Sequence, residues 1–487
     1  MYDVIVIGCG IVGAATAFEL SRCRLSIGIL EKENDVAAGT TKANSAIIHA
    51  GYDPRPGTLM AKLNREGARM AETICRELNV PYRRTGSLVL AFSGEELTVL
   101  EELYRRGIAN GVPDLRLISG EDVHRLEPNI NEDVAGALWA PGAAVVSPWE
   151  YALAMAETAV KNGAELHRSC TVTAIDAIPG GYRVHTSSGE FEARTIVNAA
   201  GVHSADIHNM AAAPAFSIRP NRGEYYLLDK CEGGRVSRVI FQCPTRAGKG
   251  VLVAPTVHGN LIAGPNAEDV PDGEDVATTR SGMDFVAKMA AKSVPSVNLR
   301  NSIRNFSGVR AIAEKDGEAF DDFIIAPAEG APGFIDLAGI KSPGLSAAPA
   351  IGKMAAKLLE EAGLCLTPKQ QFLLQPRPVR LKELSPEEKA EQIRKNPLYG
   401  RVICRCEGVS EGEIVAALHS PIPAISVDGV KRRCGAGMGR CQGGFCGPRV
   451  VDLIARERHV SPLEISQDKE GSILLTGETK SPAKEEN

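Results

Sequence analysis

The chain has 487 residues, of which 44% are hydrophobic and 24% charged, and 55 Lys and Arg against 60 Asp and Glu leave a net charge of -5. This balance excludes a strongly basic protein built to bind nucleic acid, and the length allows about two to four domains. No stretch approaches the roughly 18 apolar residues of a membrane-spanning helix, so we expect no transmembrane segment. The first apolar run, Val4 to Ile7, follows Met1 without a basic region, which predicts a cytoplasmic protein.

The first elements of the chain have the pattern of a βαβ unit. The β-branched run in "YDVIVIG" predicts a buried strand, "GIVGAATAFELSRC" has helical spacing, and "LSIGILEKE" predicts a second strand that ends in acidic residues. Gly8, Gly10 and Gly13 form a GxGxxG turn between the first strand and the helix. Glu31 falls at the end of the second strand, where a carboxylate can accept hydrogen bonds from ribose hydroxyls.

The glycines of this turn each have a physical task. The first allows the tight turn, the second allows the backbone to approach a pyrophosphate, and the third allows the helix to pack on the sheet. The helix N-terminus then favours the anion. A lone GxGxxG is a weak signal, but its place between two strands and ahead of Glu31 predicts dinucleotide binding rather than a merely structural turn.

A long connection of small and polar residues follows, from Ala37 to Asn64, unlike the short turns of a plain NAD-binding fold. Five further motifs appear along the first 360 or so residues: "NSAIIHAGYD", "TIVNAAGVHSADI", "RPNRGEYYLL", "NFSGVRAI" and "GIKSPGLSAAPAIG". With "GCGIVGAATAFEL" they make the chain resemble the D-amino-acid oxidase superfamily of FAD enzymes. Within it, the chain is most similar to the branch of anaerobic glycerol-3-phosphate dehydrogenase and L-2-hydroxyglutarate oxidase.

The resemblance implies an α/β fold for residues 1–365, in which a Rossmann-type FAD-binding domain is interleaved with an α+β substrate domain built on an antiparallel sheet. It also implies that "ELHRSCTVTAIDAI" and "RTIVNAAGVHS" meet the adenine end of FAD, although two ordinary strands with a Gly turn are an alternative. The residues implied to contact FAD are Gly8, Gly10, Gly13, Glu31, Lys32, Thr40, Thr41, Asn44, Ser45, Val172, Ala200, Gly201, Gly339, Ser342, Gly344 and Leu345.

The last four of these residues come just before or at the start of an apolar helix, whose N-terminal amides can stabilise negative charge on a reduced flavin. The sequence has only one strand-Gly-helix fingerprint, at Gly8 to Gly13, whereas flavoprotein reductases that also hold NAD(P)H need two. The letters "GAGMG", from Gly435 to Gly439, follow "VKRRC" and not a strand, so we do not interpret them as a second nucleotide site.

The substrate side has two principal candidates. His49 in "IIHAGY" matches an active-site histidine of the resembled branch, and imidazole suits removal of the proton of an alcohol. A histidine satisfied in the core is its structural alternative. Arg310 in "NFSGVRAI" matches the position that pairs with a substrate carboxylate or phosphate, and a salt bridge is its alternative. Weaker candidates for the same pocket are Tyr52, Arg222 and Lys341.

The composition changes after residue 365. Residues 366–398 are rich in proline and charge and predict a linker with a short helix, residues 399–460 a small domain, and residues 461–487 a mobile tail. The small domain holds a cysteine cluster, whereas the seven cysteines from Cys9 to Cys365 are scattered singly and indicate reduced thiols.

Cys404 and Cys406 form a CxC pair, and Cys441 and Cys446 form a CxxxxC pair. Four thiolates can hold a [2Fe-2S] cluster, and nearby glycines allow backbone amides to approach the sulfurs. The segment resembles the bacterioferritin-associated ferredoxin-like domain, whose simplest members have two residues between the second pair instead of four, so Cys434 stays open as a ligand. Zinc, which also accepts four cysteines, is the alternative metal.

These features together predict an FAD-dependent dehydrogenase for a small anionic hydroxy substrate, with glycerol 3-phosphate first. A 2-hydroxy acid such as 2-hydroxyglutarate, an amino-acid or opine substrate, and a non-catalytic electron-transfer subunit stay open. Flavin accepts two electrons and the cluster passes them on singly, so we expect a second redox protein as the electron acceptor. Membrane association through that partner is compatible with this prediction.

Overall fold

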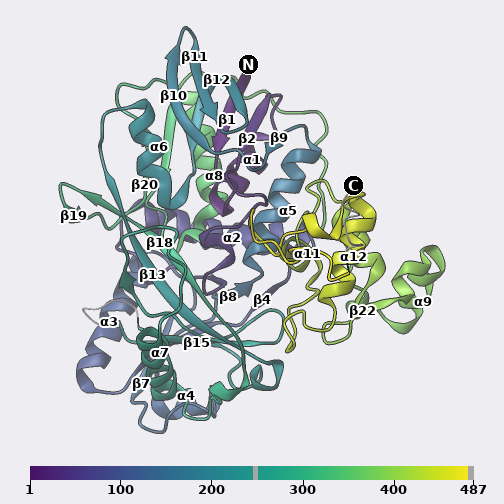
Figure 1. Ribbon diagram of the computed structural model, residues 1–487. Helices are drawn as coiled ribbons and strands as arrows, with labels where there is room; N and C mark the ends of the chain where they lie inside the picture. The colour runs from purple at the N-terminus through teal and green to yellow at the C-terminus, as the bar shows by residue number, and fades with distance from the viewer. Residues whose placement is uncertain (245–249, 481–487) are drawn as a thin grey trace. The chain divides into compact units, whose positions relative to one another are not determined.

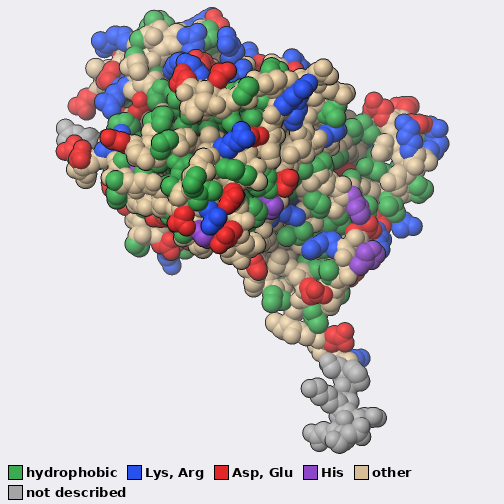
Figure 2. Space-filling model, turned by 90° about the horizontal axis from the view of Figure 1, so that it is seen from above, with side chains coloured by type: hydrophobic (Ala, Val, Ile, Leu, Met, Phe, Trp, Pro, Cys, Tyr) green, Lys and Arg blue, Asp and Glu red, His purple; other side chains and the backbone are tan. Residues whose placement is uncertain are grey.

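The computed structural model describes residues 1–244 and 250–480, which fall into two compact units. The first unit contains Met1–Lys32 and Val36–Arg377, and the second contains Glu33–Asp35 and the chain from Pro378 onward (Figure 1). In these described parts, no helix is both long and apolar enough to cross a membrane. Basic and acidic side chains both occur on the face seen in Figure 2, among hydrophobic and other side chains.

The nucleotide-binding part of the first unit is an eight-stranded sheet in the order β10-β11-β12-β1-β2-β9, with β21 paired to β12 and β20 paired to β21. Its centre is parallel, because β1 pairs in parallel with both β2 and β12. The strands are β1 (Tyr2–Ile7), β2 (Ile27–Leu30), β9 (Glu165–His167), β10 (Val172–Ile178), β11 (Gly181–Thr186), β12 (Gly189–Asn198), β20 (Ile324–Pro327) and β21 (Phe334–Ala338). The predicted Rossmann-type core is confirmed.

Helices cover this sheet, and α1 packs against both α5 and α8 (Figure 1). Helix α1 is buried almost all round, which explains why its sequence is apolar on every face. The helices of the first unit are α1 (Ile11–Leu20), α2 (Leu59–Glu77), α3 (Gly94–Ala109), α4 (Gly120–Leu126), α5 (Pro148–Lys161), α6 (Ser204–Ala211), α7 (Arg280–Ser293) and α8 (Gly344–Glu361).

The second large sheet is mostly antiparallel, in the order β19-β18-β13-β16-β15-β14-β5-β7-β6, with β17 beside β13. Its strands are β5 (Ser87–Ala91), β6 (Arg116–Ser119), β7 (Gly136–Ala140), β13 (Ser217–Leu228), β14 (Val239–Gln242), β15 (Leu252–Pro255), β16 (Leu261–Gly264), β17 (Glu268–Asp269), β18 (Ser302–Lys315) and β19 (Glu318–Ala319). Because these strands alternate along the chain with those of the first sheet, the predicted interleaving of the two parts is confirmed.

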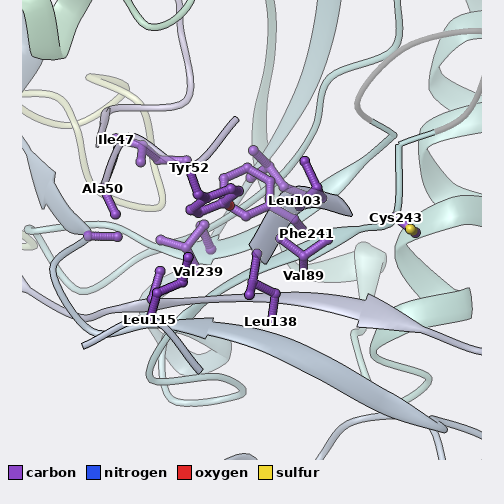
Figure 3. Packing of buried hydrophobic residues seen from close by; sticks show 14 of the residues in the cluster. Ile47, Ala50, Tyr52, Val89, Leu103, Leu115, Leu138, Val239, Phe241 and Cys243 are labelled. Carbon is purple, nitrogen blue, oxygen red and sulfur yellow. The ribbon is translucent and has the colours of Figure 1, made fainter. Parts of the chain in front are cut away.

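The small sheet of β3 (Ile47–Ile48), β8 (Ala144–Val146) and β4 (Tyr82–Arg84) joins the cofactor-side loop to the substrate part. Behind it lies a buried apolar cluster that includes Tyr52, Val89, Leu138 and Phe241 (Figure 3). The cluster draws residues from β3, β5, β7 and β14, so burial of one apolar surface fixes the loop against the second large sheet.

The second unit is built from short elements around its own core, which includes Ile403, Ile414, Val430 and Ile454. Its elements are α9 (Pro386–Lys395), β22 (Val402–Cys404), β23 (Val409–Ser410), α10 (Glu411–Leu418), α11 (Val427–Cys434) and α12 (Gly447–Arg458). Helix α10 begins with a capping box in which Ser410 and Glu413 exchange hydrogen bonds. The predicted small C-terminal domain is therefore a separate packed unit.

Residues 366–377 of the segment predicted as a linker belong to the first unit, where the Arg377 guanidinium is buried beside Glu157 at 3.2 Å. The first part of the predicted mobile tail packs in the second unit, where Ile465 is fully buried and Asp468 contacts Arg432. Residues 473–480 are exposed. Residues 481–487 lie outside the described residues.

A buried ion cluster organises the second unit. The Asp35 carboxylate accepts hydrogen bonds from the guanidinium groups of Arg432 and Arg433, and Arg432 also donates to Asp468 at 2.6 Å. Burial would raise the pKa of Asp35, but the two guanidinium groups outweigh it and hold that pKa far below the usual range. Removing one member of such a cluster leaves buried charges without partners.

We therefore predict that Asp35→Asn destabilises the second unit by about 3 to 5 kcal/mol, the usual effect of breaking a buried ion pair from one side. Hydrogen exchange of the α11 amides, followed by mass spectrometry, should report that loss. Asp452→Asn, an exposed carboxylate on α12, is the matched control and should leave α11 protected.

The pH dependence has a definite sign. Because the folded-state pKa of Asp35 is depressed, its stabilisation is present above the ordinary carboxyl pKa and is lost as the pH falls through the folded-state value. Equal protection of α11 in Asp35→Asn and the unsubstituted protein at neutral pH would contradict the assignment.

Candidate functional site

The turn between β1 and α1 is closed tightly by its glycines. A Cβ on Gly8 would lie 2.6 Å from the Ala199 carbonyl oxygen, and a Cβ on Gly13 would lie 1.9 Å from the Gly8 carbonyl oxygen. Gly8 also has a φ of +94°, which favours glycine. The middle glycine, Gly10, is the N-cap of α1, so the N-terminus of that helix begins at the turn.

Glu31 lies at the end of β2 and reaches this turn. Its Oε2 atom accepts a hydrogen bond from the Cys9 amide at 2.7 Å, and the side chain is buried. A carboxylate so placed can accept hydrogen bonds from vicinal hydroxyls. The next residue, Lys32, forms a salt bridge with Glu274, and its Nζ atom lies 3.2 Å from Nε2 of His203.

The loop from Thr40 to Ala46 links the turn to the second sheet. Thr41 Oγ1 accepts from the Ile11 amide at 2.9 Å, and Thr40 Oγ1 donates to the Val309 carbonyl on β18 at 2.6 Å. Asn44 braces the loop from within, since its Nδ2 donates to the Thr41 carbonyl. Ser45 Oγ lies 3.2 Å from the Tyr225 hydroxyl on β13. The loop is therefore held at both ends.

Residues from two other segments lie at the same end of the first sheet. Val172 begins β10, and Ala200 and Gly201 follow β12, whose Asn198 is paired with Ile7 of β1. The remaining predicted cofactor residues precede or begin α8: Gly339 has a φ of +63°, Ser342 lies in the loop before the helix, and Gly344 and Leu345 form its first turn.

His49 is oriented by three contacts. Its backbone amide donates to Ser346 Oγ at 2.8 Å, and its ring stacks on Phe241 with 5.8 Å between ring centroids. The Nε2 atom lies 3.3 Å from Ser342 Oγ. The structure thus brings together His49 and Ser342, two residues that are remote in sequence, with the imidazole half-buried beside the α8 N-terminus.

Arg310 lies on β18 directly opposite Asn221 of β13. Its Nη1 donates to Asn221 Oδ1 at 2.5 Å, and its Nη2 donates to the Asn266 carbonyl at 3.0 Å. A Cβ on Gly223 would lie 2.4 Å from Nη2, so this glycine makes room for the guanidinium. Both acceptors are neutral; therefore these hydrogen bonds orient the positive charge of Arg310 without compensating it.

Arg222 has a different environment from Arg310. It is buried and forms salt bridges with Asp275 at 2.7 Å and Glu268 at 2.9 Å. It pairs with Val309, the residue next to Arg310 along β18. Because side chains alternate between the faces of a strand, Arg222 lies on the sheet face opposite Arg310. The structure does not place these two arginines in one pocket.

The other two weaker candidates are also engaged elsewhere. Lys341 Nζ lies 3.1 Å from Asp321 Oδ1, and Arg55 pairs with the same carboxylate at 3.0 Å. Tyr52 is buried in the apolar cluster beside Val239 and Phe241 (Figure 3). Burial raises the pKa of Tyr52 well above its ordinary value, so its hydroxyl stays protonated.

The four predicted cysteine ligands form two pairs in the second unit. Cys406 and Cys441 have their Sγ atoms 3.7 Å apart, and both are exposed. Cys404 and Cys446 are buried. A hydrogen bond between their thiols lowers the pKa of Cys404 to about 5 and raises that of Cys446. The CxC pair and the CxxxxC pair therefore each contribute one buried thiol, here called inner, and one exposed thiol, here called outer.

Backbone amides surround these sulfurs. The amides of Gly437 and Glu407 donate to Cys404, and those of Phe445 and Gly443 donate to Cys441. Amide donors of this kind stabilise thiolates that hold iron. Among the described residues, no three His, Cys, Asp or Glu side chains converge on a single ion position. The four thiols are instead arranged as two neighbouring pairs.

Cys434 is placed differently from these four residues. It ends α11, lies in the hydrophobic core of the second unit, and donates from Sγ to the Val430 carbonyl of its own helix at 3.3 Å. This environment resembles that of a packed helical cysteine.

The sequence interpretation missed the residues that orient the two principal candidates. Asn221, Asn266, Ser346 and Phe241 hold Arg310 and His49 but belong to no charged or metal-binding pattern. Asn221 does stand in "RPNRGEYYLL", where strand alternation puts it and Gly223 on one face, and Ser346 stands in "GIKSPGLSAAPAIG".

Comparisons with known proteins identify both units. Residues 3–358 match the family described as FAD dependent oxidoreductase, and residues 402–456 match the BFD-like [2Fe-2S] binding domain. The glycines and Glu31 of the first unit fit an FAD nucleotide, because the tight turn leaves the α1 amides facing the place of a pyrophosphate. The four thiols with their amide donors fit a [2Fe-2S] cluster.

The chain is similar to several characterised relatives. It is 49% identical to a glycerol 3-phosphate dehydrogenase of Caloramator mitchellensis over 482 residues, which cover 99% of each chain. It is 30% identical to the mitochondrial L-2-hydroxyglutarate dehydrogenase of Caenorhabditis elegans, over 72% of this chain and 92% of that one. A solved structure of L-alpha-glycerophosphate oxidase from Mycoplasma pneumoniae, with FAD bound, has 33% identity and a TM-score of 0.73, covering 78% and 98%.

These similarities extend over both units, and they confirm the predicted family and cofactors. The match over residues 3–358 covers most of the chain, and the nucleotide turn, Glu31 and the interleaved sheets described above all lie inside it. The chain belongs to the FAD dependent oxidoreductase family, with a BFD-like [2Fe-2S] binding domain at residues 402–456.

Proposed function

We propose that this protein oxidises glycerol 3-phosphate to dihydroxyacetone phosphate and passes the electrons through its [2Fe-2S] domain to another redox protein. The observation that carries the proposal is the Arg310 guanidinium, which is oriented by neutral acceptors and keeps its charge for an anion. The 49% identity with a glycerol 3-phosphate dehydrogenase over 99% of the chain supports phosphate as that anion.

The residues of the nucleotide site have separate tasks in this proposal. The α1 amides at the Gly8–Gly13 turn would hold the FAD pyrophosphate, and Glu31 would accept from the ribose hydroxyls. Thr41 and the loop around it, closed onto β18 through Thr40, would cover the cofactor. FAD held by these residues would supply the hydride acceptor for the substrate carbon.

His49 and Arg310 act on the substrate. The phosphate would bind to the Nη groups of Arg310, which orients the carbinol group of the substrate. The His49 imidazole would accept the hydroxyl proton at Nε2, the atom that now lies 3.3 Å from Ser342 Oγ. The His49 ring stacks on Phe241, and the His49 backbone amide donates a hydrogen bond to Ser346 Oγ. These contacts hold the proton acceptor in place before the substrate binds.

A second candidate substrate is an L-2-hydroxy acid, because a carboxylate would bind the same arginine. The 30% identity with an L-2-hydroxyglutarate dehydrogenase favours it, but that similarity covers 72% of this chain. Anaerobic bleaching of the flavin absorbance separates the candidates. Glycerol 3-phosphate should bleach the flavin at a lower concentration than the other candidate substrates. If no hydroxy or amino substrate bleaches the flavin, the protein is an electron-transfer subunit and not a dehydrogenase.

The first prediction concerns the anion. Arg310→Met should weaken the apparent binding of glycerol 3-phosphate in anaerobic flavin reduction by about 2 to 5 kcal/mol, because a partly buried charge contact is lost. Arg304→Met, an exposed arginine on the same strand, is the matched control and should bind substrate normally. Unchanged affinity in Arg310→Met would assign the anion to another residue.

The second prediction concerns the proton. His49→Ala should slow flavin reduction at saturating substrate by about two to four orders of magnitude, the usual effect of a positioned base, while FAD stays bound. Stopped-flow absorbance measures that rate directly. His185→Ala on β11, which removes a histidine paired with Asp176, is the control. A normal rate in His49→Ala would exclude this residue from proton transfer.

The third prediction concerns the cluster ligands. Cys441→Ser should remove the iron and acid-labile sulfide but leave FAD bound, because the outer thiol belongs to the second unit alone. Cys434→Ser is the control, since its thiol bonds within α11, and it should retain two irons per chain as expected for the matched [2Fe-2S] domain. Iron loss in Cys434→Ser, or zinc without sulfide in the purified protein, would contradict the ligand set.

A further inference from the structure

The two cysteine pairs of the second unit differ in accessibility. Cys404 and Cys446 are each 1% exposed and lie in the hydrophobic core, whereas Cys406 and Cys441 are exposed. Electron transfer between proteins weakens steeply with distance, so an external acceptor approaches a cluster best from the outer pair. The residues around Cys406 and Cys441 therefore decide which acceptor can approach.

An aromatic ring stands beside this outer pair. The backbone amide of Phe445 donates to Cys441, while its side chain is 53% exposed. The Arg405 guanidinium lies 5.0 Å from the centre of the Phe445 ring, and Arg405 directly precedes Cys406. A single exposed apolar residue is ordinary. An aromatic ring with a guanidinium on it is the composition that is enriched at the centre of protein interfaces.

The exposed charged residues in the two segments that carry the ligands are all basic. Arg405, Arg440 and Arg449 are exposed, and each lies within three residues of a ligand cysteine. Residues 401–406 and 434–449 contain no Asp or Glu, although the whole chain carries a net charge of -5. The neighbouring Glu407 is buried and pairs with Lys382 at 3.4 Å. The arginines thus form a local basic rim on an acidic protein.

We propose that Phe445, Arg405 and Arg440 form the docking surface for an acidic electron-accepting protein. This proposal rests on the proposed function, in which electrons leave the protein through the cluster. The arginines attract acidic side chains around the acceptor's redox centre, and the Phe445 ring supplies the desolvated contact next to Cys441. Such an interface is small and transient, which suits repeated single-electron transfer.

The test uses two small redox proteins of opposite charge as probes. The full-length protein is reduced with dithionite, which makes the test independent of the substrate, and is mixed anaerobically with oxidised plastocyanin, which is acidic, or oxidised cytochrome c, which is basic. Each transfer moves one electron from the reduced protein to one metal, so that copper(II) becomes copper(I) or iron(III) becomes iron(II). No proton or atom moves.

The expected results follow from charge. At low salt the reduced protein should react faster with plastocyanin than with cytochrome c, and the plastocyanin rate should fall as salt is added. Phe445→Ala and Arg405→Glu should each lower the plastocyanin rate constant by about tenfold, and Arg405→Glu should raise the cytochrome c rate. Binding of zinc-substituted plastocyanin, which transfers no electrons, should weaken in the same order by titration calorimetry.

Two substitutions serve as matched controls. Phe285→Ala removes the exposed ring of α7, and Arg394→Glu makes the same charge change on α9. Both should leave the rates and the binding unchanged. The electron paramagnetic resonance signal of the reduced cluster should be retained in every variant, because none of these side chains is a ligand.

Several outcomes would overturn the docking proposal. They are equal rates with the two probes, faster reaction with cytochrome c, or plastocyanin rates and binding that do not respond to Phe445→Ala and Arg405→Glu. If Phe445→Ala and Arg405→Glu instead slow the reduction of the cluster by substrate and leave its reoxidation normal, these residues serve electron transfer from the flavin to the cluster and not docking of an acceptor. Failure of glycerol 3-phosphate to reduce the flavin refutes the proposed function alone, since the dithionite experiment does not use it.

Discussion

The paired strands β13 and β18 set the positions of both the proposed substrate anion site and the loop from Thr40 to Ala46. Their register places Asn221 opposite Arg310 and Gly223 opposite Gly308. Gly223 leaves space for the Arg310 guanidinium, and a Cβ on Gly308 would lie 1.9 Å from the Ala43 carbonyl oxygen. One side chain on either glycine would displace the arginine or the loop that covers the nucleotide turn. A shift of register by one residue would exchange the faces of every residue on the strand.

Strand β13 also carries a buried carboxylate, Glu224, which is linked to Arg310 by hydrogen bonds through Asn266. Glu224 is fully buried and accepts from the Asn266 side-chain amide at 2.6 Å and from the Thr279 backbone amide. Asn266 then accepts from Arg310 through its carbonyl oxygen. A buried carboxylate is tolerated because it is hydrogen-bonded. Asn266 stands between this carboxylate and Arg310, whereas Arg222 forms salt bridges directly with Asp275 and Glu268, and the charge of Glu224 also acts on Arg222. This difference supports the proposal that Arg310, and not Arg222, binds the substrate anion.

Local sequence was sufficient to predict the nucleotide turn, because Gly8, Gly13 and Glu31 act within one βαβ unit. The resemblance of separated motifs supplied the family, the cofactors and the interleaved sheets, all of which are confirmed. The environment of the basic candidates was not predictable, since it depends on contacts between distant segments. Lys341 meets Asp321, and Arg222 meets Asp275, only because of tertiary packing. A basic residue in a motif does not reveal whether a carboxylate that is remote in sequence forms a salt bridge with it.

The two redox sites place opposite demands on the chain, and the two units meet them by different means. Hydride and proton transfer require that water be kept from the reacting atoms, and a loop held onto the sheet by Thr40 and Thr41 suits the proposed flavin site in this respect. Single-electron transfer needs no enclosed site but does need close approach. In the second unit, Cys404 belongs to a strand that packs into the core, whereas Cys406 lies two residues further on, beyond the strand end. Spacing identified the four cysteines, but the ending of β22 decides which thiols face outward.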